Sequence, residues 1–178
     1  MNEPAPILRP ATPGDVDALV ELVHTAYRGE PSRAGWTTEA DLLDGSRTTP
    51  ELLAATVADR GVTVLVAASP EAGLLGCAAV TRRDPVAEFG TFAVRPGLQG
   101  HGLGSTLLAA AEEHARTHGA LAIEMSVISA RTELIAFYRR RGYVETGETL
   151  PFPYGDERYG RPRRADLEFT VLTKTLAG

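Results

Sequence analysis

A strand, a glycine-rich corner and a helix follow one another between Glu88 and His118, and this unit most constrains the fold. The strand is predicted over residues 88–94, and the helix over residues 103–118 from its apolar stripe. The corner Gln99–Gly104 reads QGHGLG, with glycines at three alternate positions. Glycine lets the backbone approach a ligand closely, and the free N–H groups of a helix's first turn bind anions. The unit therefore predicts a phosphate or pyrophosphate site.

Two common phosphate-binding loops fit this corner poorly. A P-loop ends in Gly-Lys-Ser/Thr, whereas Gly104 is followed by Ser105 and Thr106 with no lysine. A dinucleotide-binding loop follows its strand directly and would place a glycine where Ser105 stands, although Glu124 lies near the expected acidic position. The sequence therefore excludes a P-loop, and it leaves an oxidoreductase with a dinucleotide-binding loop as a distant alternative.

The corner, together with an element further along the chain, resembles the GCN5-related N-acetyltransferases (GNAT). The acetyl-CoA signature of that family is Gln/Arg-x-x-Gly-x-Gly/Ala after a strand ending in Ala-Val, and here Ala93-Val94 precedes Gln99–Gly104. Phe137-Tyr138 and Gly142-Tyr143 resemble the family's aromatic-tyrosine and glycine-aromatic element. In element order the resemblance covers about residues 7–174.

The resemblance implies an enzyme with acetyl-CoA as co-substrate. Such an N-acetyltransferase would transfer the acetyl group to a primary amine of a small molecule, peptide or protein, by direct attack in a ternary complex. Because a fold does not fix its chemistry, the alternative is a non-catalytic acyl-CoA-binding regulatory domain.

Composition is that of an ordinary globular domain, with 43% hydrophobic and 23% charged residues. The net charge of −5 argues against a general nucleic-acid-binding protein. The chain shows no signal-peptide pattern and no apolar run of membrane-spanning length, and the single cysteine, Cys77, cannot form an internal disulfide. We expect one cytoplasmic domain over residues 1–178, without nucleic-acid or membrane partners and without a metal site.

The pattern of elements predicts a mixed α/β (α+β) fold, with a mostly antiparallel sheet flanked by helices. Apolar strands at 62–68, 74–81 and 88–94 are joined by short turns and so form an antiparallel meander. The helical crossover makes the next strand, 122–128, parallel to 88–94. Further helices are expected to start at Thr12, Trp36, Thr49 and Glu133, and further strands at Ile7, Tyr143 and Leu167. The resemblance implies that this is the GNAT acyl-CoA N-acyltransferase fold.

Acetyl transfer to an amine needs two proton transfers, because an ammonium with a pKa of about 10.4 must lose a proton and the CoA thiolate must gain one. Glu88, six residues before Val94, is the candidate base, since several family members carry a glutamate at this distance. Glu124 on the neighbouring strand and a surface role for Glu88 stay open. Tyr138 is the candidate acid from the resemblance, and a core tyrosine beside Phe137 is the alternative.

Cofactor contacts are expected mainly from the backbone. Alternation places Phe92 and Val94 on one strand face with Glu88. The resemblance implies that the backbone of Phe92 and Val94 pairs with the pantetheine amides. Ser129 and Arg131 stand where many family members have a cofactor-binding asparagine, so that contact stays open. The complete set of expected cofactor-binding residues is Phe92, Ala93, Val94, Gln99, Gly100, His101, Gly102, Leu103, Gly104, Ser105, Ser129, Arg131 and Tyr138.

Acceptor recognition is expected from two irregular segments, residues 28–37 and 149–166. The candidate substrate-binding residues on or beside them are Tyr27, Trp36, Tyr154, Asp156 and Glu157. Two acids among aromatic rings suit an ammonium group. The alternative is that nearby arginines neutralise the acids and the second segment covers the interface of a homodimer.

Overall fold

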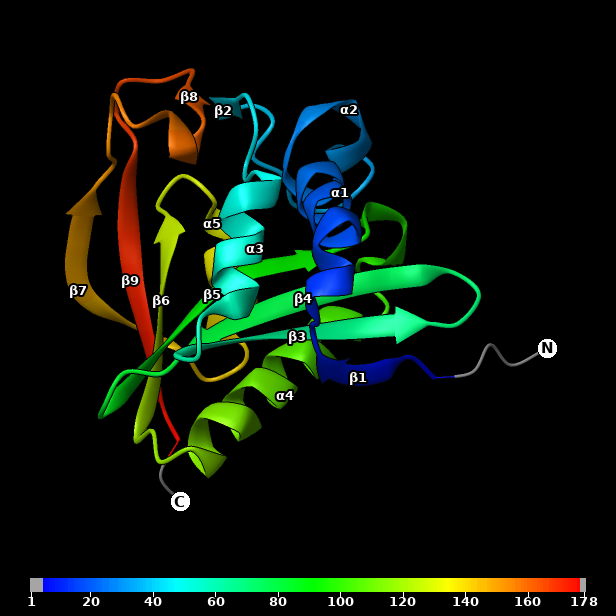
Figure 1. The fold of residues 1–178 in the computed structure, drawn as a ribbon. Helices are drawn as coiled ribbons and strands as arrows, with labels where there is room; N and C mark the ends of the chain where they lie inside the picture. Colours follow the sequence, from blue (N-terminus) through cyan, green and yellow to red (C-terminus); the bar gives the residue numbers. More distant parts are fainter. Residues whose placement is uncertain (1–4, 177–178) are drawn as a thin grey trace.

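The computed structural model describes residues 5–176, and its centre is a twisted seven-stranded sheet (Figure 1). The strands lie in the order β1-β3-β4-β5-β6-β9-β7, and all neighbours are antiparallel except the parallel pair β5 and β6. Their bounds are β1 Ile7–Pro10, β3 Val62–Ser69, β4 Gly73–Thr81, β5 Val86–Val94, β6 Ala122–Ile128, β7 Val144–Pro151 and β9 Glu168–Thr175. The predicted mixed, mostly antiparallel sheet is confirmed.

A second, two-stranded pairing joins β2 (Leu43–Asp44) to β8 (Arg161–Pro162). The helical segments are η1 Pro13–Asp15, α1 Val16–Tyr27, α2 Gly29–Ser32, α3 Pro50–Ala58, η2 Pro96–Leu98, α4 Leu103–Thr117, α5 Thr132–Arg139 and η3 Glu157–Tyr159. Segment 149–166, expected to be irregular, therefore contains the end of β7, one 3₁₀ turn and β8. No helix between residues 5 and 176 combines the length and apolar character that crossing a membrane requires.

The prediction of a helix that starts at Trp36 is wrong. Residues 36–42 form bends and turns, and side chains satisfy two of their backbone donors in place of helical carbonyls. The N–H of Trp36 donates to Oε1 of Gln99 at 3.1 Å, and the N–H of Ala40 donates to Oγ1 of Thr38 at 3.0 Å. The single turn α2 lies before this segment, where the sequence suggested only a polar break.

Two apolar cores lie on opposite faces of the sheet. Helices α4 and α5 cover one face, and α1 and α3 cover the other (Figure 1). Strand alternation supplies both cores: Leu65 and Ala67 face α4, whereas Val64 and Val66 face α1. Cys77 is buried on the α1 side, as a small core residue.

A β-bulge interrupts β5. The register pairs Ala79 with Gly90 and Cys77 with Ala93, so two residues of β5 lie opposite one residue of β4. The bulge residue Thr91 has a φ of +45°, a backbone conformation that costs free energy for a side chain branched at Cβ.

The extra residue reverses which face of the sheet the side chains of β5 lie on after the bulge. Phe89 and Val94 both belong to the core beneath α4, although strict alternation would place them on opposite faces. Ala93 belongs to the α1 core. The expectation that Glu88 shares a face with Phe92 and Val94 is therefore wrong, because the bulge lies between them.

Strands β5 and β6 separate soon after they pair. Their parallel pairing covers Val86–Glu88 and Ala122–Glu124, whereas β6 continues beside β9 as far as Ile128. Figure 1 shows β5 running away from β6 and β9 toward the α1 end of the molecule. One edge of β5 is thereby left open along its second half.

Candidate active site

A cavity of about 420 Å³ lies beside the open edge of β5; we call it the donor cavity. Its walls are the end of β5, the glycine corner, α5 and the turn at Trp36. Of the predicted cofactor-binding residues, those that line it are Phe92, Ala93, Val94, Gln99, Gly100, Gly102, Gly104, Ser105 and Arg131. His101 and Leu103 line a different hollow, beside the turn that joins β3 to β4.

The glycine corner has the geometry of an anion site. Gly100 and Gly102 have φ angles of +82° and +91°, which favour glycine, and no atom lies within 4 Å of a Cβ built on either. Helix α4 begins at Leu103, so the N–H groups of its first turn lack helical carbonyl partners. Arg141 donates to Oγ of Ser105 at 2.6 and 3.1 Å, which places a guanidinium beside that helix start. These groups fit a pyrophosphate.

The carbonyl groups of Phe92 and Val94 point to the open edge of β5. The backbone groups of neighbouring residues in a strand point to opposite edges. The N–H of Arg95 donates to the carbonyl of Leu75 in β4 at 2.9 Å, so the groups of Ala93 point to β4 and those of Phe92 and Val94 point away from it. Two side chains occupy these carbonyls: the hydroxyl of Tyr27 donates to Phe92, and Nε2 of Gln99 donates to Val94 at 3.1 Å. The edge thus offers two acceptors that a ligand with amide groups can take over.

Trp36 lies in the donor cavity. Its ring centroid is 5.5 Å from that of Phe137 on α5. It does not line the second cavity described below, so its predicted role in acceptor binding has no geometric support.

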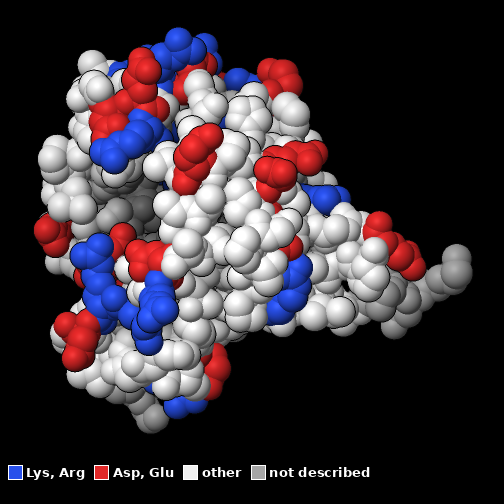
Figure 2. Space-filling view, viewed as in Figure 1, with Lys and Arg blue, Asp and Glu red and all other residues white. Residues whose placement is uncertain are grey.

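A second cavity, of about 560 Å³, occupies the split between β5 and β6; we call it the acceptor cavity. Residues 88–92 of β5 and 125–128 of β6 form its floor, and residues 150–153 and Tyr159 form its outer wall. In Figure 2 the surface is hollowed on this side, and arginines and acids lie on the rim. Tyr27, Phe92, Arg131 and Leu134 line both cavities, which therefore meet at the bulge.

Glu88 and Tyr138 both line the acceptor cavity. The carboxylate of Glu88 is 54% exposed and forms an ion pair of 2.8 Å with Arg83, a type of contact that contributes little to stability in water. Glu124, the alternative carboxylate, is paired with Glu88 in the strand register but does not line the cavity.

Tyr138 is buried among aromatic rings, with Phe137 at 5.3 Å and Tyr143 at 5.6 Å between centroids. Burial raises the pKa of its phenol well above the usual value, so the group stays protonated at neutral pH. It can therefore serve as a hydrogen-bond donor inside the cavity.

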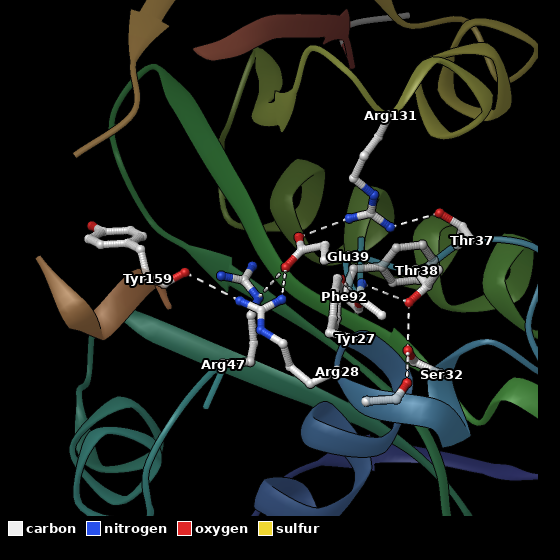
Figure 3. A network of polar contacts seen from close by, with 12 residues as sticks. Tyr27, Arg28, Ser32, Thr37, Thr38, Glu39, Arg47, Phe92, Arg131 and Tyr159 are labelled. Atoms are coloured by element: carbon white, nitrogen blue, oxygen red, sulfur yellow. Dashed lines mark hydrogen bonds and ion pairs between the residues drawn. The ribbon is translucent and has the colours of Figure 1, made fainter. Parts of the chain in front are cut away.

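A buried carboxylate that sequence patterns did not reveal, Glu39, lies in the wall of the acceptor cavity (Figure 3). It forms ion pairs with Arg28, with Arg131 at 3.0 Å and with Arg47 at 3.8 Å. Arg131 also donates to Oγ1 of Thr37 at 2.7 Å. We call Glu39, Arg28, Arg47 and Arg131 the Glu39 cluster. Its members come from irregular segments and helix ends, where no periodicity marks them.

The remaining predicted residues lie outside both cavities. The hydroxyl of Ser129 contacts that of Thr170 at 2.8 Å, and Tyr154 donates to the carbonyl of Arg164. Asp156 is held by Arg158 through contacts of 2.6 to 3.1 Å, and Glu157 does not line either cavity. The acids expected to bind an ammonium therefore do not reach the acceptor cavity.

Comparison with protein families identifies the architecture. The profile of the Acetyltransferase (GNAT) family matches residues 18–143, which include both cavities' shared wall. The chain belongs to this family. It is accordingly an acetyltransferase, and the resemblance seen in the glycine corner is confirmed. No curated protein sequence matches the chain significantly.

Solved structures with the same fold include several N-acetyltransferases. The ribosomal-protein-S18-alanine N-acetyltransferase from Escherichia coli is 14% identical, with a TM-score of 0.71 over 97% of this chain and 94% of that one. The ribosomal-protein-alanine N-acetyltransferase from Brucella melitensis is 24% identical, with a TM-score of 0.70 over 95% and 99%. The acetyltransferase yncA from Salmonella typhimurium, solved with its cofactor acetyl-CoA, is 22% identical, with a TM-score of 0.69 over 97% and 95%.

The Glu39 cluster predicts a specific loss of acid stability. Burial acts to raise the pKa of Glu39, but Arg47, Arg131 and Arg28 outweigh it and lower the pKa to about 2. Because the folded-state pKa is depressed, the stabilisation is complete above the ordinary value of 4.5 and is lost as the pH falls toward 2. Glu39→Gln should lower the free energy of unfolding by roughly 3–5 kcal/mol at pH 7, since it leaves three guanidiniums without their carboxylate.

Urea unfolding at a series of pH values checks this. The difference between the wild type and Glu39→Gln should shrink below pH 4.5. Glu148→Gln, which changes an exposed side chain of β7, serves as the control and should match the wild type within about 0.5 kcal/mol. A Glu39→Gln variant as stable as this control would contradict the role given to the cluster.

Proposed function

We propose that this acetyltransferase transfers the acetyl group of acetyl-CoA to a primary amine by direct attack within a ternary complex. The supporting observation is that the donor cavity and the acceptor cavity meet at Phe92, Tyr27 and Arg131. A donor and an acceptor bound in separate cavities can react where these join, without passing the acetyl group through a side chain.

Acetyl-CoA is the acyl donor, and the donor cavity suits its parts. The glycine corner and Arg141 would hold the pyrophosphate. The carbonyls of Phe92 and Val94 would accept hydrogen bonds from the pantetheine amides, once Tyr27 and Gln99 release them. The thioester would then lie at the bulge, between the two cavities.

Direct transfer is supported by the state of the single cysteine. Cys77 is fully buried, and burial raises the pKa of its thiol to about 12. The thiolate, which is the nucleophilic form, is therefore scarce at neutral pH. An acetylated cysteine is a poor candidate for an intermediate, which leaves the amine itself as the attacking group.

Two residues of the acceptor cavity would move the protons. Glu88, exposed at the outer end of the floor, would take the proton of the ammonium through water. Tyr138, protonated and close to Phe92, with 6.3 Å between ring centroids, would donate to the departing thiolate. The base and the acid are thus two different residues that line one cavity.

Binding of acetyl-CoA is the first test. At a concentration 100 times its dissociation constant, acetyl-CoA should stabilise the fold by about 2.7 kcal/mol, a rise of several degrees in Tm, and NADH should give no shift. Gly102→Val should abolish the shift, because its backbone has a φ of +91° that valine disfavours. Gly97→Val, at an exposed position with no positive φ and no atom near the new Cβ, is the matched control. Stabilisation by NADH without any effect of acetyl-CoA would refute the proposal.

The proton-transfer roles predict different kinetic effects. Glu88→Gln should slow turnover most near neutral pH and less at higher pH, where the free amine becomes more abundant. Tyr138→Phe should lower kcat without a matching loss of acetyl-CoA affinity. Glu124→Gln, on the neighbouring strand but outside the cavity, is the control for Glu88. Full activity of both variants between about pH 6 and pH 9 would show that these roles are misassigned, and a loss confined to Glu124→Gln would move the base there.

A further inference from the structure

Positive charge exceeds negative charge in the Glu39 cluster, of which Glu39, Arg47 and Arg131 line the acceptor cavity. One carboxylate, that of Glu39, faces three guanidiniums, and the exposed side-chain fractions of Arg28, Arg131 and Glu39 are only 2%, 6% and 4%. Burial of an uncompensated charge is unfavourable unless a counter-charge arrives. Within residues 5–176, Nε of Arg28 and Nε of Arg131 are moreover buried without a hydrogen-bond partner. The cluster is thus incompletely paired.

Arg47 is the most exposed arginine of the cluster. Its Nε lies 3.8 Å from the Glu39 carboxylate, beyond hydrogen-bonding distance, and its guanidinium carbon lies 5.0 Å from the centroid of the Tyr27 ring. Its side chain is 30% exposed, and it lines the acceptor cavity but not the donor cavity. The Arg131 guanidinium lies over the same ring, at 5.4 Å. Two guanidiniums therefore gather around the tyrosine that marks the junction of the cavities (Figure 3).

No other acid of the cavity offsets this charge. Glu88 is the other carboxylate in the lining; it is paired with Arg83 and lies four residues before Phe92 along β5. Asp156 is engaged by Arg158. Burial raises the pKa of Tyr27 and of Tyr138, so neither of these phenols of the lining carries a charge to offset it at neutral pH.

We propose that the acceptor is an amine that carries a carboxylate, and that Arg47, with Arg131, binds this carboxylate. This inference rests on the function proposed above and specifies its substrate class as an amino acid. A carboxylate can accept two parallel N–H bonds from one guanidinium, which matches the planar fork of Arg47. It would also supply the negative charge that the cluster lacks. The amino group of the same molecule would then point along β5 toward the thioester and Glu88.

The same charge would repel polycationic acceptors. A polyamine or an aminoglycoside brings several ammonium groups, each of which would meet Arg47 and Arg131 in a partly desolvated cavity. The expectation from sequence, that acids of segment 149–166 bind an ammonium, is thereby replaced by recognition of an acid group through arginines.

Matched acceptor pairs test the proposal directly. We would measure CoA release with a panel of L-amino acids and their carboxamides, and with spermidine and an aminoglycoside. The amine of the carboxamide has a lower pKa than the amine of the amino acid, so more of it is in the free form that attacks. A preference for the amino acid over its carboxamide therefore cannot come from intrinsic reactivity. We expect kcat/KM to be at least about tenfold higher for the best amino acid than for its carboxamide, in line with one charge-assisted bidentate contact.

Substitution of Arg47 locates the effect. Arg47→Gln should raise KM for the amino acid about tenfold or more, leave KM for its carboxamide and for acetyl-CoA nearly unchanged, and so remove the preference. Arg47→Lys should keep part of it, because the charge remains while the bidentate geometry is lost. Arg60→Gln, at an exposed position remote from both cavities, is the control and should behave like the wild type. Tm measurements on each variant show that the fold is retained.

The outcomes separate this proposal from the one on which it rests. An enzyme that acetylates amines with no preference for the acid, or that prefers spermidine or the aminoglycoside, overturns the substrate class and leaves acetyl transfer standing. A preference for amino acids that survives in Arg47→Gln overturns the role of Arg47. Failure to bind acetyl-CoA and to acetylate any amine would overturn the proposed function itself.

Discussion

The bulge at Thr91 is the constraint on which the site depends. By adding one residue to β5 it turns the strand away from β6, and the parallel pairing ends at Glu88. Two consequences follow from this one irregularity. The carbonyls of Phe92 and Val94 are left without a neighbouring strand, so they can accept hydrogen bonds from a ligand. The sheet also opens, and the donor cavity and the acceptor cavity meet at this opening. The positive φ of Thr91 is a local cost that the surrounding sheet and two packed cores offset.

The Glu39 cluster holds the acceptor side of this opening together. Its ion pairs join the end of α1, the turn after α2 and the segment before α5, and Arg28 also reaches the carbonyl of Tyr159 at 3.2 Å. A buried ionic network therefore links these segments to one another. Burying a network with more positive than negative charge costs free energy. That cost becomes useful if the missing negative charge belongs to the substrate, because binding then completes the pairing.

Much of the fold follows from sequence patterns, because periodicity and capping residues act locally. Strand β6 was predicted over its full length, 122–128, and α4 to within one residue. The glycines of the corner correctly indicated a tight backbone turn, because the positive φ angles of Gly100 and Gly102 favour glycine. The bulge was missed, although Gly90 inside a strand is a signal for one. Glu39 was missed for a different reason: Arg28 and Arg131 lie 11 and 92 residues away in the chain, and only the tertiary structure brings them together.

The most direct measurement is a crystal structure of the complex with acetyl-CoA. The arrangement described here predicts the pyrophosphate at the N–H groups of the glycine corner and the thioester at the bulge. It also predicts that the side chains of Tyr27 and Gln99 leave the carbonyls of Phe92 and Val94, which the pantetheine amides then occupy. Acetyl-CoA bound elsewhere, with both of these side chains still in place on the β5 edge, would contradict it.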